Sequence, residues 1–258
     1  MRTDEKEILQ VFSQGTIRKY KEERERKTFF NYYLINPVLR QLIGNLQNKK
    51  LLDIGCGYGL DLEWYKKEGA QVVGIDINIE MIRIAKANPS LSNVPIFNRS
   101  IYDLQFNNEF DYCVANLVLD QIFYIELAFR NVNHALKSGG IFFFSVVHPL
   151  NSATCGYSKE LTDYFSKDKD YYKPKSLGKK LPYYHRTFQD YFSCAEQTGF
   201  KVESLVEPQP VTEAQTLFPD DYQSKIRVPE GLIMKLRKQP FNLKNLLDFK
   251  HERRKKNN

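Results

Sequence analysis

The 258-residue chain is long enough for one large α/β domain, and its composition, 42% hydrophobic and 27% charged, is that of a globular protein. Its 38 basic and 31 acidic residues give a net charge of +7, but the basic residues are scattered, so a nucleic-acid-binding class is not favoured. The 4 cysteines show neither close pairing nor metal-ligand spacing, which predicts free thiols, a reducing compartment and no metal site. With no signal peptide and no apolar stretch long enough to cross a bilayer, we expect a cytoplasmic protein that does not engage a membrane.

The first 48 residues predict a helical prefix to the main domain. Ile8, Val11 and Phe12 form an apolar stripe at helical spacing. Residues 19–27 are highly charged and are expected to be solvated, and an aromatic-rich stretch then leads into a helix over residues 38–46. The aromatic side chains of this prefix are expected either to cover a ligand site or to belong only to the core.

A short apolar run over residues 51–54 predicts a buried strand, and glycines at alternate positions follow it. Glycine permits positive φ and close approach of a ligand to the backbone, so the turn offers N–H groups to something small and polar. The spacing is Asp53-x-Gly55-x-Gly57-x-Gly59. Leu60 stands where a dinucleotide-binding fingerprint would need its third glycine, which disfavours a nicotinamide oxidoreductase.

Strands and helices alternate after this turn, which predicts parallel βαβ units and a doubly wound, Rossmann-like sheet with helices on both faces. The predicted strands are residues 70–76, 95–99, 110–116 and 141–148, and the predicted helices are residues 60–68, 79–87 and 120–136. The tyrosine-rich residues 150–185 interrupt the alternation and predict a long loop that serves as a lid or binding insertion. A helix over 187–198 and strands over 200–206 and 231–236 predict a terminal antiparallel pair.

The glycine motif, together with a second strand that ends in Asp76, resembles the first motifs of class I S-adenosylmethionine (SAM) methyltransferases. The likeness runs from about residue 28 to residue 238 and points to a small-molecule methyltransferase-like subgroup. Its further parts are Asn31-Tyr32-Tyr33, Phe110-Asp111-Tyr112, Leu136-Lys137-Ser138-Gly139-Gly140, Phe144 to Pro149, Tyr184-His185-Arg186-Thr187, Gly199-Phe200 and Leu205 to Pro208. The resemblance implies a methyltransferase domain over residues 49–240 with an insertion at 150–185. The prefix over residues 1–48 would cover the cofactor and substrate, and residues 241–258 would be a basic tail.

The resemblance also implies which residues hold SAM, because this fold binds ligands at the carboxyl ends of its strands. Asp53 is expected to orient the amino group, the glycines to lie against the methionine part and Asp76 to hold the ribose hydroxyls. The full set of predicted cofactor residues is Asp53, Gly55, Gly57, Asp76, Ile77, Ser100, Ile101 and Asn116. Ser100 departs from the pattern, since many relatives carry an acid there; for Asp76 the alternative is a helix N-cap.

The resemblance predicts transfer of a methyl group to an oxygen or nitrogen atom of a small-molecule acceptor, with S-adenosylhomocysteine (SAH) as product. His148, at the end of its strand, is the predicted base, and the alternative is that it only shapes the turn before Pro149. Tyr33 and His185 are weaker candidates for contacting the acceptor. Methylation of RNA or protein, and SAM binding without catalysis, are the alternative functions. The sequence predicts no oligomeric state.

Overall fold

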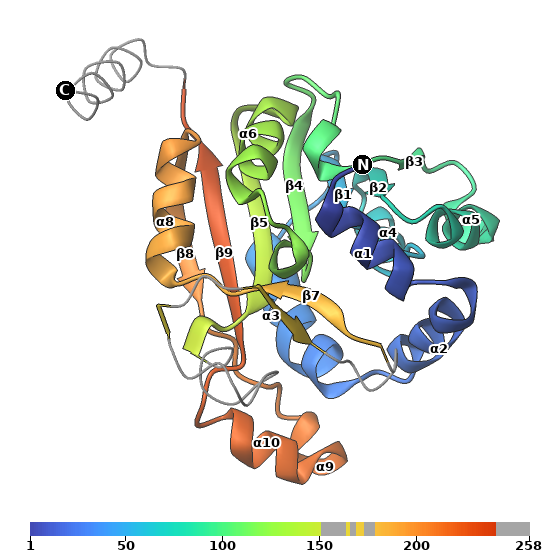
Figure 1. The fold of residues 1–258 in the computed structure, drawn as a ribbon, viewed down its shortest axis with the longest axis vertical. Helices are drawn as coiled ribbons and strands as arrows, with labels where there is room; N and C mark the ends of the chain where they lie inside the picture. Colours follow the sequence, from blue (N-terminus) through green and yellow to red (C-terminus); the bar gives the residue numbers. More distant parts are fainter. Residues whose placement is uncertain (151–163, 166–168, 173–178, 241–258) are drawn as a thin grey trace.

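The computed structural model describes residues 1–150, 164–165, 169–172 and 179–240 of the chain (Figure 1). Its centre is a 7-stranded sheet with the strand order β3-β2-β1-β4-β5-β9-β8. The strands are β1 (Lys50–Ile54), β2 (Gln71–Asp76), β3 (Ile96–Asn98), β4 (Phe110–Asn116), β5 (Leu136–Val147), β8 (Phe200–Val206) and β9 (Gly231–Lys238). Neighbouring strands from β3 to β5 are parallel, and β9 runs antiparallel to both β5 and β8. The predicted Rossmann-like sheet with a terminal antiparallel strand is therefore confirmed.

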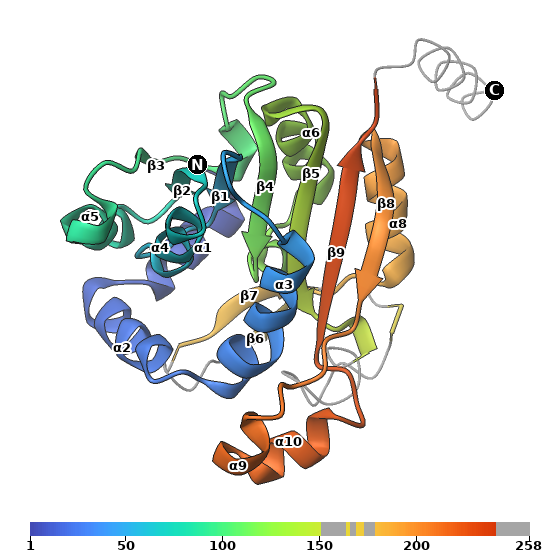
Figure 2. The ribbon, with the colours of Figure 1, turned by 180° about the vertical axis from the view of Figure 1, so that it is seen from behind.

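Helices cover both faces of this sheet because successive residues of a buried strand point to opposite faces. Leu52 packs in one core with residues of α6 (Ile125–Ala135) and α8 (Phe188–Gln197), on the face seen in Figure 1. Its neighbour Leu51 packs on the other face, seen in Figure 2. The helices of that second face are α3 (Asn36–Ile43), α4 (Leu60–Lys67) and α5 (Ile79–Ala87). Two apolar cores thus hold the parallel strands in register and bring their carboxyl ends to one edge.

The helical prefix consists of α1 (Thr3–Val11), α2 (Gln14–Glu25) and the π-helix η1 (Phe29–Ile35). Both ends of α1 are attached to the sheet domain. A carboxylate oxygen of Asp4 accepts a hydrogen bond from the backbone N–H of Phe123 at 3.0 Å and another from the Tyr102 hydroxyl. Just after the helix, the Phe12 carbonyl accepts from the side-chain amide of Asn78 at 2.9 Å. These contacts hold α1 across the carboxyl edge of the strands.

The insertion contains a β-hairpin, although the sequence predicts a loop there. Strands β6 (Lys169–Tyr172) and β7 (Leu181–Tyr184) pair antiparallel, and β7 crosses just beyond the arrowhead of β4 (Figures 1 and 2). Leu181 is buried against Val11 of α1, so a contact far away in sequence stabilises this strand. The other residues predicted as insertion, and the predicted tail at 241–258, lie outside the described residues.

Several element boundaries also differ from the sequence predictions. The helix expected over residues 120–136 begins only at Ile125, after the 3₁₀ helix η4 (Leu119–Gln121), and strand β5 begins five residues earlier than expected. Between β8 and β9 lie two short helices that the sequence analysis missed, α9 (Ala214–Leu217) and α10 (Pro219–Lys225). The remaining 3₁₀ helices are η2 (Pro89–Leu91) and η3 (Ile101–Asp103). Within the described residues, no helix combines the length and the apolar character needed to cross a bilayer.

The aromatic core between the sheet and α6 predicts a large loss of stability on truncation. Phe142 is fully buried and makes an edge-to-face contact with Phe129, with ring centroids 5.4 Å apart. We expect Phe142→Ala to lower the free energy of unfolding by about 3–5 kcal/mol, because it leaves a cavity in a close-packed core. Urea denaturation followed by circular dichroism measures this change. The matched control Phe192→Ala, at a side chain that is 42% exposed on α8, should cost much less; equal losses would contradict the packing described here.

Candidate active site

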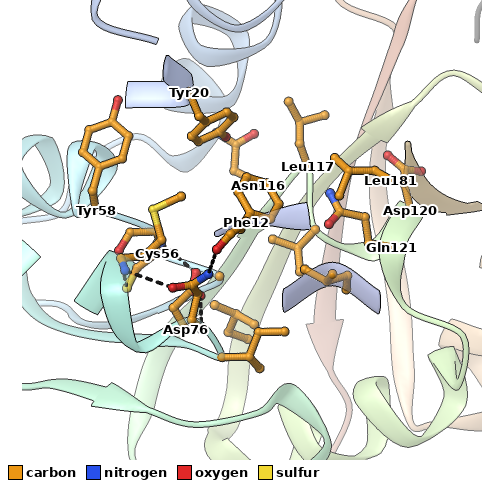
Figure 3. Close-up of a pocket in the computed structure, with 18 of the residues that line it drawn as sticks. Phe12, Tyr20, Cys56, Tyr58, Asp76, Asn116, Leu117, Asp120, Gln121 and Leu181 are labelled. Carbon is orange, nitrogen blue, oxygen red and sulfur yellow. Dashed lines mark hydrogen bonds between the residues drawn. The ribbon is translucent and has the colours of Figure 1, made fainter. Parts of the chain in front are cut away.

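A cavity of about 370 Å³ lies at the carboxyl edge of the parallel strands (Figure 3). Its floor is formed by the ends of β1, β2 and β4, and residues of α1, α2, η1 and β7 complete its wall. In Figure 3, Asp76 and Cys56 lie toward one end, while Asp120, Gln121 and Leu181 lie toward the other. The cavity therefore joins the glycine turn to a second region under the hairpin.

The turn after β1 has the backbone conformation that its glycines predict. Gly55 and Gly57 have φ angles of 74° and 54°, in the left-handed region that favours glycine. A Cβ added at Gly55 would lie 2.5 Å from Cγ2 of Val118, whereas one at Gly57 would meet nothing within 4 Å. Gly57 thus presents bare backbone to open space in the cavity, as the binding of a ligand against the turn requires.

Asp76 lies at the end of β2 and is joined to this turn. Its Oδ2 accepts from the backbone N–H of Gly57 at 2.9 Å, and its Oδ1 accepts from the N–H of Asn78 at 2.7 Å. Burial raises the pKa of this carboxyl, although both N–H groups act in the opposite direction. The N-cap of α5 is Asn78, whose side chain accepts from Glu80 and Met81, so Asp76 does not act as that cap. Each carboxylate oxygen retains capacity for a further hydrogen bond, which suits recognition of a diol.

Asp53 is a buried carboxylate without a full set of partners. Its side chain lies at the cavity wall with the residue only 3% exposed, and among the described residues Oδ2 has no hydrogen-bond partner. Burial raises its pKa well above the ordinary value, and the nearby charges of Asp61 and Asp76 add to this effect. A cationic amine in the cavity would satisfy this oxygen and lower that pKa. This chemistry fits the predicted contact with the amino group of SAM.

Asn116, at the end of β4, joins Asp61 of the cavity wall to Asn36 and Ser145, which are not among the described lining residues. Its Nδ2 donates to Asn36 Oδ1 at 3.0 Å and to Asp61 Oδ2 at 3.1 Å, and its Oδ1 accepts from the Ser145 hydroxyl at 2.6 Å. Asp61 also pairs with Arg40, with 3.4 Å between Nη2 and Oδ1. The network holds Asp61 in the wall, at a position that the sequence analysis did not single out.

Of the three residues predicted to lie near the adenine, two line the cavity and one does not. Ile77 and Ile101 line the cavity, together with Arg99, which was not predicted. The Ser100 hydroxyl instead caps η3 by accepting from the N–H of Tyr102 at 2.9 Å. Within the described part of the chain, Ser100 is absent from the cavity wall.

The three residues predicted to serve the acceptor are not brought to the cavity. The side chain of His148 is fully buried; its Nε2 lies 2.8 Å from Glu207 Oε1, and its Nδ1 accepts from the N–H of Leu150 at 3.2 Å. Tyr33 is buried in a small cluster with Phe29, and His185 Nε2 lies 2.9 Å from a backbone carbonyl. None of the three belongs to the cavity wall formed by the described residues, so their predicted roles stay predictions.

Other wall residues were missed because they come from segments with no motif. Arg24 lies in a stretch predicted to be solvated, yet it is half-buried and lines the cavity beside Tyr20. The buried oxygens Glu23 Oε2 and Asn31 Oδ1 have no hydrogen-bond partner within the described residues and line the same cavity. The signal that could have found Asp120 is a carboxyl group inside the apolar run that follows β4.

Comparisons with known proteins agree with this geometry. The family model described as Methyltransferase domain matches residues 52–144. An S-adenosylmethionine dependent methyltransferase from Mesorhizobium loti has a similar crystal structure, with a TM-score of 0.67 and 25% identity, covering 78% of this chain and 96% of that one. An uncharacterized Haemophilus influenzae protein is 25% identical over 85% of this chain and 92% of its own.

A further relative is the ubiquinone biosynthesis O-methyltransferase of Chromobacterium violaceum. It is 32% identical over 56% of this chain, and the match spans only 64% of that enzyme's length. The matched family domain contains the glycine turn and Asp76, and these residues fit the cofactor as described above. Residues 52–144 thus belong to a methyltransferase domain of the class I, Rossmann-like type, and SAM is its cofactor.

The position of Asp76 predicts a specific loss of cofactor affinity. We expect Asp76→Ala to weaken SAH binding roughly 30- to 150-fold, because charge-assisted hydrogen bonds to the ribose contribute on the order of 2–3 kcal/mol. Isothermal titration calorimetry measures the change. Asp103→Ala, at an exposed acid of η3, is the matched control and should bind SAH as the wild type does. A loss of less than about threefold would contradict the ribose contact.

The buried carboxyl of Asp53 predicts a pH-dependent stability of the ligand-free protein. The pKa of Asp53 is raised in the folded state, so the folded protein favours the protonated carboxyl group. Below the unfolded-state pKa of about 4 the group is protonated in both states and does not change the free energy of unfolding. As pH rises above that value, the group lowers the free energy of unfolding. Asp53→Asn should therefore melt at a higher temperature than the wild type at pH about 8, with the difference vanishing near pH about 4. Differential scanning calorimetry tests this, and a variant less stable at the higher pH would refute it.

Proposed function

We propose that this methyltransferase transfers the methyl group of SAM to an oxygen or nitrogen atom of a small-molecule acceptor, with SAH as product. The observation that carries the proposal is the cavity of about 370 Å³, in the size range of small-ligand sites, which joins the glycine turn to an apolar region under β7. The likeness to a ubiquinone biosynthesis O-methyltransferase favours oxygen as the methylated atom.

The residues that would hold SAM follow from their contacts. The backbone at Gly57 would lie against the methionine part, and the unpartnered oxygen of Asp53 would accept from its ammonium group. Asp76 would accept from the ribose hydroxyls, with Ile77 and Ile101 on the apolar faces of the base. SAM supplies an electrophilic methyl group on a positively charged sulfur.

The protein's own contribution to transfer is alignment and exclusion of water. In-line displacement needs the acceptor atom, the methyl carbon and the sulfur on one line, and holding reactants in that geometry can provide most of the rate. Ile8 and Phe12 of the prefix and Leu181 of the hairpin contribute apolar side chains to the cavity wall, and Leu181 lies at the end that holds Asp120 (Figure 3). Desolvation there strengthens the nucleophilicity of the acceptor atom.

Methylation of a macromolecule is the second reading, and the wall of the cavity disfavours it. Residues of α1, α2 and β7 cover the region beyond the carboxyl edge, so an RNA base or a protein side chain would have to pass them. The positive net charge of +7 and the basic sequence of residues 250–256 are the features that favour RNA.

A labelling experiment separates these readings. The protein is incubated with methyl-tritiated SAM and, in separate reactions, with an ultrafiltered metabolite extract, total RNA or total protein. We expect the label to enter only the small-molecule fraction, with equal release of SAH. Gly57→Val is the control that should abolish transfer, because its side chain fills the space where the cofactor meets the backbone. Labelling of RNA that falls steeply with added salt would overturn the proposal.

A further inference from the structure

Asp120 is a buried acid at the acceptor end of the cavity. The residue is 6% exposed and belongs to η4, directly after β4. Its Oδ2 accepts a hydrogen bond from the backbone N–H of Val147 at 3.0 Å, which fixes the carboxyl group at the end of β5. Among the described residues, its Oδ1 has no hydrogen-bond partner. One oxygen is therefore anchored and the other is left for a ligand.

A buried arginine holds the backbone that carries this acid. Arg186 donates to the carbonyls of Leu119 at 3.1 Å and Phe123 at 3.1 Å, and also to that of Ile122. Within the described residues, the hydrogen bonds of the Arg186 guanidinium go to backbone carbonyls, and none joins it to the carboxylate of Asp120. The arginine thus fixes the position of η4 and leaves the carboxylate chemically available.

The surroundings of Asp120 keep its proton affinity high. Burial raises the pKa of its carboxyl to about 7, although the Val147 N–H and the charge of Arg186 act against this. The other ionisable groups around it are Tyr191 of α8, which feels its charge, and Glu5 and Tyr183 in the wall of the same cavity. A carboxyl group that titrates near neutral pH is matched to the task of accepting a proton during catalysis.

The neighbours of Asp120 favour an uncharged acceptor. Val147, Ile122 and Leu181 give this end of the cavity an apolar wall, so a cationic amine would lose its hydration on entering. Gln121 lies beside Asp120 in Figure 3, and its side-chain amide makes no hydrogen bond to the described part of the chain. That amide can donate to an acceptor oxygen as negative charge develops on it.

We propose that Asp120 is the general base of the reaction and that the acceptor carries a weakly acidic hydroxyl group, of the phenol or enol class, on an apolar body. The inference rests on the proposed function and names its base and its substrate class. It assigns the role predicted for His148 to a residue that lines the cavity.

The step balances without any further reactant. The ionised carboxylate of Asp120 takes the hydroxyl proton, and the oxygen's electron pair forms the new C–O bond. The C–S bond breaks with its electron pair going to sulfur, so the sulfonium becomes the neutral thioether of SAH. The protonated Asp120 then returns its proton to solvent.

Two phenols of similar size and different acidity test this inference. Wild type and Asp120→Asn are assayed with methyl-tritiated SAM and either 4-cresol, which is un-ionised at neutral pH, or 4-nitrophenol, which is largely ionised at pH about 8. We expect the variant to lose roughly 10²–10⁴-fold in kcat/KM with 4-cresol and far less with 4-nitrophenol, because the second needs no base. Asp103→Asn is the matched control and should keep the wild-type rate with both.

A second measurement uses the wild type alone. Its kcat/KM for 4-cresol should fall as pH drops below about 7, because the base becomes protonated. SAH affinity of Asp120→Asn, measured by calorimetry, should stay close to that of the wild type. Equal losses with the two phenols, or a wild-type profile without this limb, would overturn the role of Asp120. Transfer to benzylamine but to neither phenol would overturn the substrate class and leave the proposed function standing.

Discussion

The hydrogen bond from the Gly57 N–H to the Asp76 carboxylate is the contact on which the rest of the site depends. It ties the turn after β1 to the end of β2, and the N–H groups of Gly55 and Cys56 reinforce it by donating to the Ile75 carbonyl at 2.8 and 2.9 Å. The turn can fold back this tightly only because glycine tolerates positive φ. The same fold leaves bare backbone facing the cavity. The turn after β1 and the Asp76 carboxylate at the end of β2 are thus held together as one structural unit.

The cavity wall gathers carboxyl groups that the ligand-free protein cannot satisfy completely. Asp53 and Asp120 each keep one buried oxygen without a partner in the described residues, and burial raises the pKa of both. Asp53 lies near the end of β1 and Asp120 lies in η4, so the two carboxyl groups occupy different parts of the cavity wall. The first faces the region assigned to a cationic amine, where charge neutralisation favours ionisation. The second lies among apolar side chains, which raise its pKa to about 7, so that near neutral pH it is partly ionised and its carboxylate form can accept a proton. One cavity thus contains a carboxyl group placed to bind a cation and, in another part, a carboxyl group in apolar surroundings.

Local patterns predicted the sheet and the cofactor turn, because both depend on short-range rules of apolar periodicity and glycine geometry. Predictions from local patterns were incomplete where contacts between segments far apart in the sequence determine the structure. The hairpin strand β7 (Leu181–Tyr184) forms because Leu181 packs on α1, and Arg24 is half-buried in the cavity wall because α2 packs near the glycine turn. His148 does follow its strand as predicted, but Glu207, from a segment 59 residues away, binds its ring outside the cavity. Nothing in the local sequence around these residues encodes such partners.

The attachment of α1 at both ends affects how SAM enters the cavity and how SAH leaves it. Asp4 holds its first turn to Phe123, and the carbonyl of Phe12 holds its far end to Asn78. Every turnover converts SAM into SAH, so the spent cofactor must leave before the next can enter. Because α1 is held at both ends, it cannot rotate away from the cavity as a rigid body about one end. Either one of the two hydrogen bonds must break, or SAM and SAH must exchange past α2 or the hairpin. If one hydrogen bond must break, the rate at which SAH leaves depends on the Asp4–Phe123 or the Phe12–Asn78 hydrogen bond as well as on the contacts made to SAH itself.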